Sequence, residues 1–322
     1  DHGKLLEHLR AMTFFDEAAI STTVQMMSGY QALIDHGLDG LLKHLMALIQ
    51  EHAPALLVVD GFRAATLYAD TDKELSRFIH QLDNLVSGAR CTTLLLSPTA
   101  GVAPRTEHTL VDGLIELSTR HRGLRRSRLV EVHKLRGSAH MSGRHLFRIT
   151  DGGLHVFPRF EARLSTNPPA PPQVPGRVTS GVQALDAMMG GGVMPGSTTA
   201  ILGAPGAGKT LLGLSFLKAG LDQGEPCAYF GFYESPERVV AKAAGVGLIL
   251  QAAADAGLLS LQWQPPLELY MDELGERLLR QLERIRATRL FIDGVEGFRD
   301  AAAFPDRFRM FITALTVQLR AA

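Results

Sequence analysis

The stretch that decides the fold is Gly203-Ala204-Pro205-Gly206-Ala207-Gly208-Lys209-Thr210, which matches the pattern G-x-x-x-x-G-K-[ST] at every fixed position. It follows a short apolar run, 198–202, that predicts a strand, and it opens onto a helix-compatible stretch, 211–219. A strand that points such a loop outward, and a helix whose first N–H groups face it, form a phosphate-binding site. The alternative is a glycine-rich turn with a chance Lys-Thr, and the matching context on both sides disfavours it.

The residues of this loop have separate tasks in that chemistry. Gly203, Gly206 and Gly208 allow the backbone to curl into a nest of N–H donors that side chains would block. Lys209 is expected to reach the β- and γ-phosphates, and the hydroxyl of Thr210 is expected to ligate Mg²⁺. All eight residues are therefore assigned to binding a nucleoside triphosphate.

A second motif supplies the acidic partner of the loop. Residues 289–293 are an apolar run that ends in Asp293, as expected of a buried parallel strand that presents a carboxylate at its C-terminal edge. Asp293 suits the position that holds Mg²⁺ through water. The alternative is an Asp that caps the next loop. Asp60 ends a similar run, 55–60, and there the two interpretations weigh equally, because no phosphate loop precedes it.

Composition limits the class of protein. The 322 residues indicate about two domains, and 33 basic against 33 acidic residues give a formal net charge of +0. Nothing global therefore favours nucleic acid or an anionic membrane as the main partner. Cys91 and Cys227 lie too far apart for a disulfide framework, and no apolar run approaches the roughly 20 residues that span a bilayer. We expect a cytoplasmic protein without a membrane segment.

A proline-rich segment divides the chain. Residues 166–176 contain five prolines in eleven residues and should be extended and stiff. This linker separates a first predicted domain, 1–165, from a second, 177–322.

Both predicted domains carry the same local pattern. A helical stretch, 38–50, leads into the run that ends at Asp60-Gly61, and 274–285 leads into the run that ends at Asp293-Gly294. The two aspartates are 293 − 60 = 233 residues apart. At the same offset Phe78, Ile79 and Leu82 match Phe311, Ile312 and Leu315. An internal repeat of domain length is the simplest explanation.

The offset also predicts what each copy lacks. Asp1 falls opposite Glu234, so the first domain is expected to lack the stretch that would carry its own phosphate loop. Ala322 falls opposite Ala89, so the second domain is expected to lack everything that corresponds to residues 91–159.

Glu234 is the candidate for orienting the attacking water. It follows an apolar run, 226–232, that predicts the strand next to the phosphate loop, and a carboxylate at the tip of that strand can place water against the γ-phosphate. The alternative is that Glu234 only caps the helix expected from Glu237 onward. Glu237 itself should lie in the first turn of that helix, where its negative charge interacts favourably with the helix dipole.

The run 130–140 predicts a strand with two cations on one face, Lys134 and Arg136. Residues 147–158 predict a hairpin that turns at 151–153. Two cations side by side on an exposed face can act on a phosphate held by another subunit. The alternative is a solvated basic edge that discourages strand aggregation, and spacing alone favours it.

For two further groups of residues a structural interpretation is favoured. The segment 120–128 holds five arginines and His121. It could contact nucleic acid, but it lacks interleaved aromatic residues, so a charged loop is favoured. The 12 histidines do not pair with cysteines at metal-ligand spacing. We expect most of His133, His140, His145 and His155 to be structural.

These features together resemble the KaiC-type branch of the RecA-like ATPases. Residues 180–186, 190–192 and 195–196 are similar to the family's approach to its loop, and 134–140 and 147–158 are similar to its domain-closing signature. The resemblance covers nearly the whole chain. It implies an α/β fold of tandem RecA-like phosphate-loop domains, with mostly parallel central sheets, helices on both faces, and each domain incomplete at the chain ends.

The resemblance also implies an assembly. A homo-oligomer is expected, a hexameric ring in which ATP and Mg²⁺ lie between neighbouring subunits and Lys134 and Arg136 act on the adjacent subunit's nucleotide. The family usually has two glutamates after the loop-adjacent strand, where this chain has Tyr233-Glu234. That difference is expected to slow hydrolysis or alter phosphotransfer.

The resulting interpretation is an ATP-binding, Mg²⁺-dependent ATPase of KaiC type that acts as a slow switch toward an unidentified signalling partner. Lys209 would stabilise phosphate charge, Thr210 and Asp293 would hold the metal, and Glu234 would place the water. Autokinase activity is implied by resemblance alone, and Thr109, in the stretch equivalent to the family's phosphorylated region, is not assigned as a phosphosite. The alternatives are a DNA-handling motor of the recombinase or helicase kind, which zero net charge disfavours, and a non-catalytic scaffold that binds ATP only to assemble.

Overall fold

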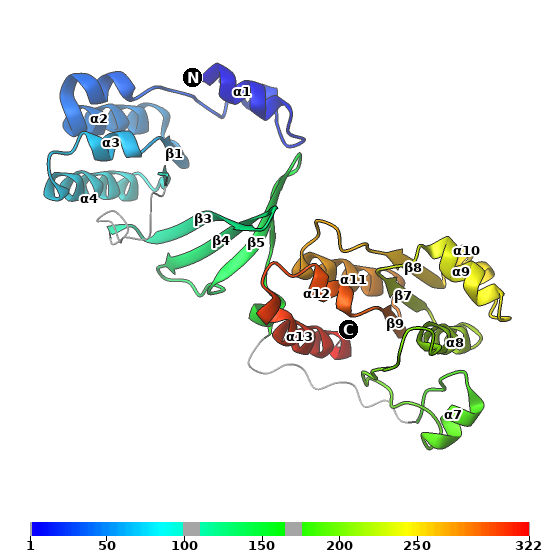
Figure 1. Cartoon of the computed structure of the whole chain (residues 1–322). Helices are drawn as coiled ribbons and strands as arrows, with labels where there is room; N and C mark the ends of the chain where they lie inside the picture. Colours follow the sequence, from blue (N-terminus) through cyan, green and yellow to red (C-terminus); the bar gives the residue numbers. More distant parts are fainter. Residues whose placement is uncertain (1, 99–109, 165–175, 322) are drawn as a thin grey trace. The chain divides into compact units, whose positions relative to one another are not determined.

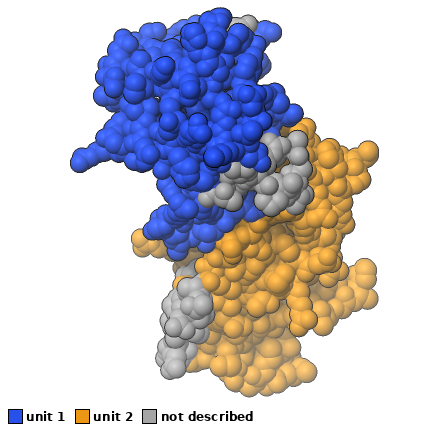
Figure 2. All heavy atoms as spheres, turned by 90° about the vertical axis from the view of Figure 1, so that its left-hand side faces the viewer, with its two compact units in different colours: residues 1–116, 132–140, 149–153 blue, residues 117–131, 141–148, 154–322 orange. Residues whose placement is uncertain are grey.

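The computed structural model describes residues 2–98, 110–164 and 176–321. It divides into two compact units, coloured separately in Figure 2. Unit 1 comprises residues 1–116, 132–140 and 149–153, and unit 2 comprises residues 117–131, 141–148 and 154–322. The domain boundaries 1–165 and 177–322, with a linker at 166–176, stay a prediction. Within the described residues, no helix combines the length and the apolar character that crossing a membrane requires.

Unit 2 is built on a parallel sheet of three strands in the order β8-β7-β9 (Figure 1). These are β7 (Cys227–Gly231), β8 (Leu259–Trp263) and β9 (Arg289–Asp293). The central strand, β7, is buried at all five residues, as its apolar sequence predicted. Its last residue, Gly231, lies in register with Asp293 of β9, so the carboxyl ends of both strands meet at one edge of the sheet.

Helices cover both faces of this sheet, as the α/β prediction required. Side chains alternate along a strand, and Ala228 and Phe230 accordingly join one buried cluster while Cys227 and Tyr229 join another. The first cluster includes residues of α6 (Phe160–Arg163), α11 (Met271–Ile285), α12 (Glu296–Asp300) and α13 (Phe308–Ala321). The second includes residues of α8 (Lys209–Leu221) and α9 (Pro236–Ala244), with α10 (Gln251–Asp255) packed against it. The remaining short elements of the unit are α7 (Gln183–Met188) and the 3₁₀ turn η2 (Pro305–Arg307).

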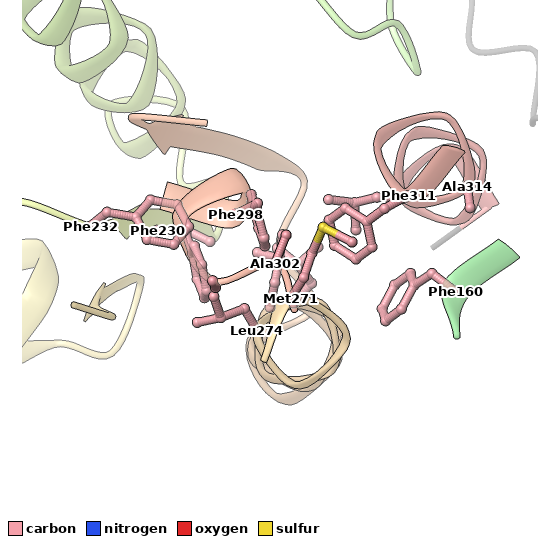
Figure 3. Packing of buried hydrophobic residues seen from close by; sticks show 14 residues of the cluster. Phe160, Phe230, Phe232, Met271, Leu274, Phe298, Ala302, Phe311 and Ala314 are labelled. Atoms are coloured by element: carbon pink, nitrogen blue, oxygen red, sulfur yellow. The ribbon is translucent and has the colours of Figure 1, made fainter. Parts of the chain in front are cut away.

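Phe160, on α6, lies at one end of the first cluster, beside α11 and α13 (Figure 3). Its ring is fully buried, and its centroid is 5.1 Å from that of Phe311. The ring also packs directly on the backbone of Gly275, at the place where a Cβ atom would be. A glycine in the interior of α11 therefore makes room for an aromatic residue.

Gly275→Ala is expected to destabilise the protein by up to about 2 kcal/mol. The overlap with the Phe160 ring costs about 1–3 kcal/mol, which exceeds the roughly 1 kcal/mol that alanine gains over glycine in a helix. Urea unfolding followed by circular dichroism would measure the change. Gly88→Ala is the matched control, because nothing lies within 4 Å of the Cβ position at Gly88, and this change should be neutral or stabilising. A stable Gly275→Ala variant would contradict the packing.

Unit 1 holds α1 (His2–Arg10), the 3₁₀ turn η1 (Glu17–Ala19), α2 (Tyr30–His52), α3 (Arg63–Leu67) and α4 (Asp72–Gly88). Its parallel pair of strands is β1 (Leu56–Asp60) and β2 (Thr92–Leu96). Residues of α2, α3 and α4 pack with Leu57, Val59 and Leu95 into one buried cluster. The helices therefore cover one face of this pair.

The other face of the β1–β2 pair differs from the prediction of a buried strand. Leu56, Val58, Leu94 and Leu96 alternate with the buried residues and are each about half exposed. The apolar run 55–60 predicted burial on both faces, but only one layer of helices packs on the pair within the described residues.

The structure confirms the internal repeat in detail. Adding 233 to the bounds of β1 gives those of β9, 289–293, and adding 233 to the bounds of α3 gives those of α12, 296–300. Ala53 and Arg286, which follow α2 and α11 at the same offset, both adopt left-handed backbone conformations, with φ of 44° and 51°. Gly61 and Gly294, which follow the two strands, have φ of 78° and 88°.

A four-stranded sheet contributes residues to both units. Its order is β3-β4-β5-β6, with β3 (Gly113–Arg122), β4 (Arg125–Leu135), β5 (Arg144–Thr150) and β6 (Gly153–Phe157). β4 and β5 pair antiparallel. The predicted hairpin is confirmed, since β5 and β6 join at residues 151–152 and Gly153 has a φ of 97°. Lys134 lies on β4, and Arg136 follows its end.

The strand predicted for residues 198–202 is absent from the structure, and this prediction was wrong. These residues form no regular element, and Leu202 is 91% exposed. A strand needs a hydrogen-bonding neighbour, and among the described residues β9 is paired on one edge only, with β7. Residues 198–202 therefore have no paired strand among the described residues.

Candidate nucleotide-binding site

The glycine-rich loop leads directly into the N-terminus of α8. Gly206 and Gly208 have φ of 81° and 87°, conformations that other residues adopt with strain. Gly208 is the N-cap of α8 and provides no side-chain cap. The first N–H groups of a helix have no partner within the helix, and they carry the positive end of its dipole. Residues 203–210 thus form a loop of the kind that binds phosphate.

Lys209 lies folded over this loop. Its Nζ donates hydrogen bonds to the carbonyl oxygens of Gly203, at 2.7 Å, and Ala204, at 2.8 Å. The positive charge is therefore held at the loop, within reach of any anion bound there. An anion with oxygen acceptors could replace these carbonyls as the partner of the ammonium group.

Asp293, at the end of β9, is brought next to Thr210, the second residue of α8. The Thr210 hydroxyl donates to Oδ2 of Asp293 at 3.1 Å. The two residues are 83 positions apart in sequence, and the fold joins them as the motif analysis predicted. A hydroxyl and a carboxylate are the hard oxygen ligands that Mg²⁺ prefers, so these residues fit that metal.

Tyr229 is a third member of this group, and the sequence analysis missed it. Its hydroxyl donates to the same Oδ2 of Asp293 at 3.2 Å. The side chain is 1% exposed, and burial, followed by the charge of Asp293, raises the pKa of the phenol well above its usual range. The phenol therefore remains a proton donor. Two hydroxyl groups converge on one carboxylate oxygen.

A buried arginine holds β9 in place beside α8. Arg289, at the start of β9, donates to the carboxylate of Glu225 at 2.7 Å and to the backbone carbonyls of Thr179, at 2.9 Å, and Phe216, at 3.1 Å. Phe216 belongs to α8. These bonds fix the strand against the helix, and so they fix the position of Asp293 relative to Thr210. The hydrogen bond from Arg289 and its charge hold the pKa of Glu225 below its usual range against the opposing effect of burial.

Glu234 follows the carboxyl end of β7 and lies outside α9. The N-cap of α9 is Ser235, and Glu237 lies in the first turn as predicted. The Glu234 carboxylate forms an ion pair with Lys242. The interpretation of Glu234 as a cap of α9 is therefore wrong, whereas its role toward water stays a prediction.

Lys134 and Arg136 belong to unit 1, and each has a partner there. Lys134 Nζ donates to the carbonyl of Val111 at 2.5 Å, and Arg136 forms an ion pair with Asp112 at 3.0 Å. Both bind to the segment just before β3. Their action on a neighbouring subunit's nucleotide stays a prediction. His108 and Thr109 lie outside the described residues.

The arginine-rich segment 120–128 is not a charged loop. It comprises the end of β3, a turn and the start of β4, and three of its five arginines contact residues of unit 2. Arg120 lies 4.6 Å from the ring centroid of Phe304, Arg122 donates to the carbonyl of Ala302 at 3.0 Å, and Arg125 donates to the carbonyl of Leu269. A guanidinium group can stack on an aromatic ring or donate to backbone carbonyls, so these arginines have partners within the protein.

Three of the histidines have partners in the structure. His145 is buried, and its Nδ1 accepts the N–H of Arg159 at 3.0 Å. Burial lowers the pKa of His145, which keeps it neutral as this acceptor. His133 pairs with Glu116 at 2.7 Å, and His155 lies 3.9 Å from a carboxylate oxygen of Glu276.

Comparison with known proteins agrees with this geometry. The model of the family described as "ATPase: KaiC" matches residues 12–161 and again residues 178–322. The chain belongs to the KaiC family of ATPases. The two matched stretches correspond to the two copies of the internal repeat, and the second contains the phosphate loop and Asp293.

Named relatives are circadian clock proteins. The chain is 28% identical over 293 residues to the circadian clock oscillator protein KaiC of Picosynechococcus sp.. The aligned region covers 89% of this chain and 56% of that relative. The chain is 27% identical over 293 residues to KaiC 1 of Synechocystis sp., with 89% and 55% covered, and 27% identical over 284 residues to KaiC of Acaryochloris marina, with 87% and 53% covered. The chain thus spans about half the length of the curated relatives it matches.

Proposed function

We propose that this chain is an ATP-binding, Mg²⁺-dependent ATPase that works as a slow switch within an oligomer. The observation that carries the proposal is the meeting of Thr210 and Asp293 at the N-terminus of α8, beside the ammonium group of Lys209. Membership in a family of ATPases supports ATP as the nucleotide.

In this proposal each residue has one task. The N–H groups of residues 203–210 and the ammonium of Lys209 bind the β- and γ-phosphates and stabilise the charge that develops on them. Thr210 and Asp293 hold Mg²⁺, which when bound neutralises charge on the phosphate oxygens. Glu234 orients the attacking water, and its ion pair with Lys242 has to loosen for it to do so.

The slow rate follows from Tyr233. This residue stands where the family usually has a first glutamate, and its hydroxyl lies 3.4 Å from a carboxylate oxygen of Asp300. A phenol does not accept a proton from water at neutral pH, so one carboxylate fewer is available near the γ-phosphate. Turnover is therefore slow in comparison with a site that has both.

The oligomer in this proposal is a hexameric ring with nucleotide between subunits, in which Lys134 and Arg136 act on the neighbour's phosphates. Size-exclusion chromatography with light scattering, with and without Mg-ATP, tests it. We expect growth to a ring when Mg-ATP is present. A chain that remains a monomer throughout, and that gives no calorimetric signal with ATP, ADP or GTP, would contradict the proposal.

Related measurements would distinguish two other functions, a DNA-binding motor and a scaffold. The bonds of Arg120, Arg122 and Arg125 within unit 2 weigh against a motor that binds DNA through this segment, and salt-sensitive binding of single-stranded DNA would favour it. A scaffold would show unchanged turnover in Glu234→Gln but no oligomer in Lys209→Ala. The family resemblance also implies autokinase activity, which would be detected as incorporation of labelled phosphate into the chain.

A further inference from the structure

Asp293 accepts two hydroxyl hydrogen bonds on one and the same oxygen. Thr210 reaches Oδ2 from α8, and Tyr229 reaches it from β7. Neither bond uses Oδ1. The Thr210 hydroxyl is the proposed metal ligand, so this inference rests on the proposed function. The Tyr229 hydroxyl is a separate donor that approaches from inside the sheet.

The register of the strands shows how the phenol reaches Asp293. Tyr229 pairs with Phe291, and Gly231 pairs with Asp293, one step further along the same face. The phenol therefore has to extend along β7 over Gly231. A Cβ atom at Gly231 would lie 2.5 Å from both Oη and Cε1 of Tyr229. The glycine leaves the space that the phenol occupies.

The surroundings of Tyr229 leave its ring little freedom. The ring meets that of Phe291 edge-on, with centroids 5.8 Å apart, and Phe291 in turn packs on the backbone of Gly213 in α8. Leu214 and Leu217 of α8 and Val239 of α9 belong to the same buried cluster. Phenylalanine would fill this volume, and a buried hydroxyl is costly unless it is hydrogen-bonded. The partner it has in the structure is Asp293.

We propose that Tyr229 is a positioning residue for the metal-binding carboxylate. Its O–H holds Oδ2 of Asp293, so the carboxylate would keep its orientation if the Thr210 hydroxyl were to ligate a metal instead. Partners of this kind, which orient a ligand without touching the metal, typically change metal affinity by 10–100-fold when they are removed.

Tyr229→Phe tests this role, because it removes only the hydroxyl. Uptake of Mn²⁺ by the chain in the presence of ATP is measured by electron paramagnetic resonance, as the fall in the free-ion signal beyond the fall that ATP alone causes. ATP binding without metal is measured by calorimetry in excess EDTA. We expect Mn²⁺ affinity to fall by about 10-fold and metal-free ATP affinity to stay within about twofold. Ser215→Ala is the matched control, since it removes a hydroxyl group of α8 whose partner is the carbonyl oxygen of Leu211, and it should leave Mn²⁺ affinity unchanged.

A second variant tests the same geometry from the other side. Gly231→Ala keeps the Tyr229 side chain, but the added Cβ atom displaces the phenol from Asp293. This variant should therefore also lower Mn²⁺ affinity. Unchanged Mn²⁺ affinity in Tyr229→Phe, or an equal loss of ATP affinity with and without metal, overturns the positioning role. A wild-type chain that takes up no Mn²⁺ with ATP overturns the proposed function as well, which distinguishes the two failures.

Discussion

Lys209→Ala is expected to lower the affinity for Mg-ATP by about 100-fold and to abolish measurable turnover. The ammonium group of Lys209 is held at the loop by two carbonyl oxygens, which are weak partners compared with a triphosphate. Charged hydrogen bonds contribute roughly 1.5–3 kcal/mol each, and about 2.8 kcal/mol corresponds to a factor of 100 in affinity. Isothermal titration calorimetry with Mg-ATP would measure the loss.

Lys218→Ala is the control for this experiment. Lys218 lies on the same helix, nine residues further along, and forms an ion pair with Asp222. Its removal lowers the charge of the chain by the same amount but at the other end of α8. Affinity for Mg-ATP should therefore stay near that of the wild type. Equal losses in the two variants would show that general charge, and not the loop, binds the nucleotide.

Much of the candidate site could be predicted from the sequence, because its elements are local. The loop 203–210 and the strand end at Asp293 are each a few consecutive residues, and a parallel sheet brings strand ends to one edge. The repeat added a second signal, since the run 55–60 marked the equivalent strand. Thr210 and Asp293 then meet as the motifs predicted.

Tyr229 could not be predicted in the same way, because its bond depends on the register of two strands. The sequence shows that Tyr229 and Gly231 share one face of β7, but only the pairing of Gly231 with Asp293 brings the phenol to the carboxylate. A tyrosine followed two residues later by a glycine, in an otherwise apolar strand, was the available signal.

Two predictions, for residues 198–202 and 120–128, were wrong for one reason. In both cases the local structure depends on partners that are distant in sequence. Residues 198–202 have the composition of a strand but pair with no strand among the described residues. The composition of 120–128 predicts a charged loop, yet Arg122 donates to a backbone carbonyl 180 residues away in sequence. Local composition carries no information about either neighbour.

Arg307→Ala is expected to destabilise the protein by about 3–5 kcal/mol, the largest effect on stability that we predict. Arg307 donates to both oxygens of Asp272, at 2.9 and 3.0 Å, and to both oxygens of Glu161, at 2.7 and 2.9 Å. Asp272 is 0% exposed. Removal of one partner leaves a buried charge without compensation, which costs about 3–5 kcal/mol. Thermal unfolding should show a fall in Tm of roughly 10 °C.

The control is Arg280→Ala. Arg280 lies on α11, as Asp272 does, and pairs with Glu276 across 3.7 Å, but its side chain is mostly exposed. Exposed pairs contribute about 0–1 kcal/mol, so the change should shift Tm little. A loss of stability in Arg280→Ala equal to that in Arg307→Ala would contradict the role of burial.

A second substitution should then restore stability to the Arg307→Ala variant. Burial raises the pKa of Asp272, and Arg307 opposes that rise. Without Arg307 the carboxylate is a buried charge, and Asp272→Asn removes that charge while its oxygen can still accept the N–H of Phe160, now at 3.1 Å. The double variant is therefore expected to be more stable than the single one at neutral pH. Lower pH should act in the same direction, because a group whose pKa is higher in the folded than in the unfolded protein gains stability as the pH falls through its folded value. If neither Asp272→Asn nor a lower pH reduced the loss of stability in Arg307→Ala, the buried charge of Asp272 would not be the cause of that loss.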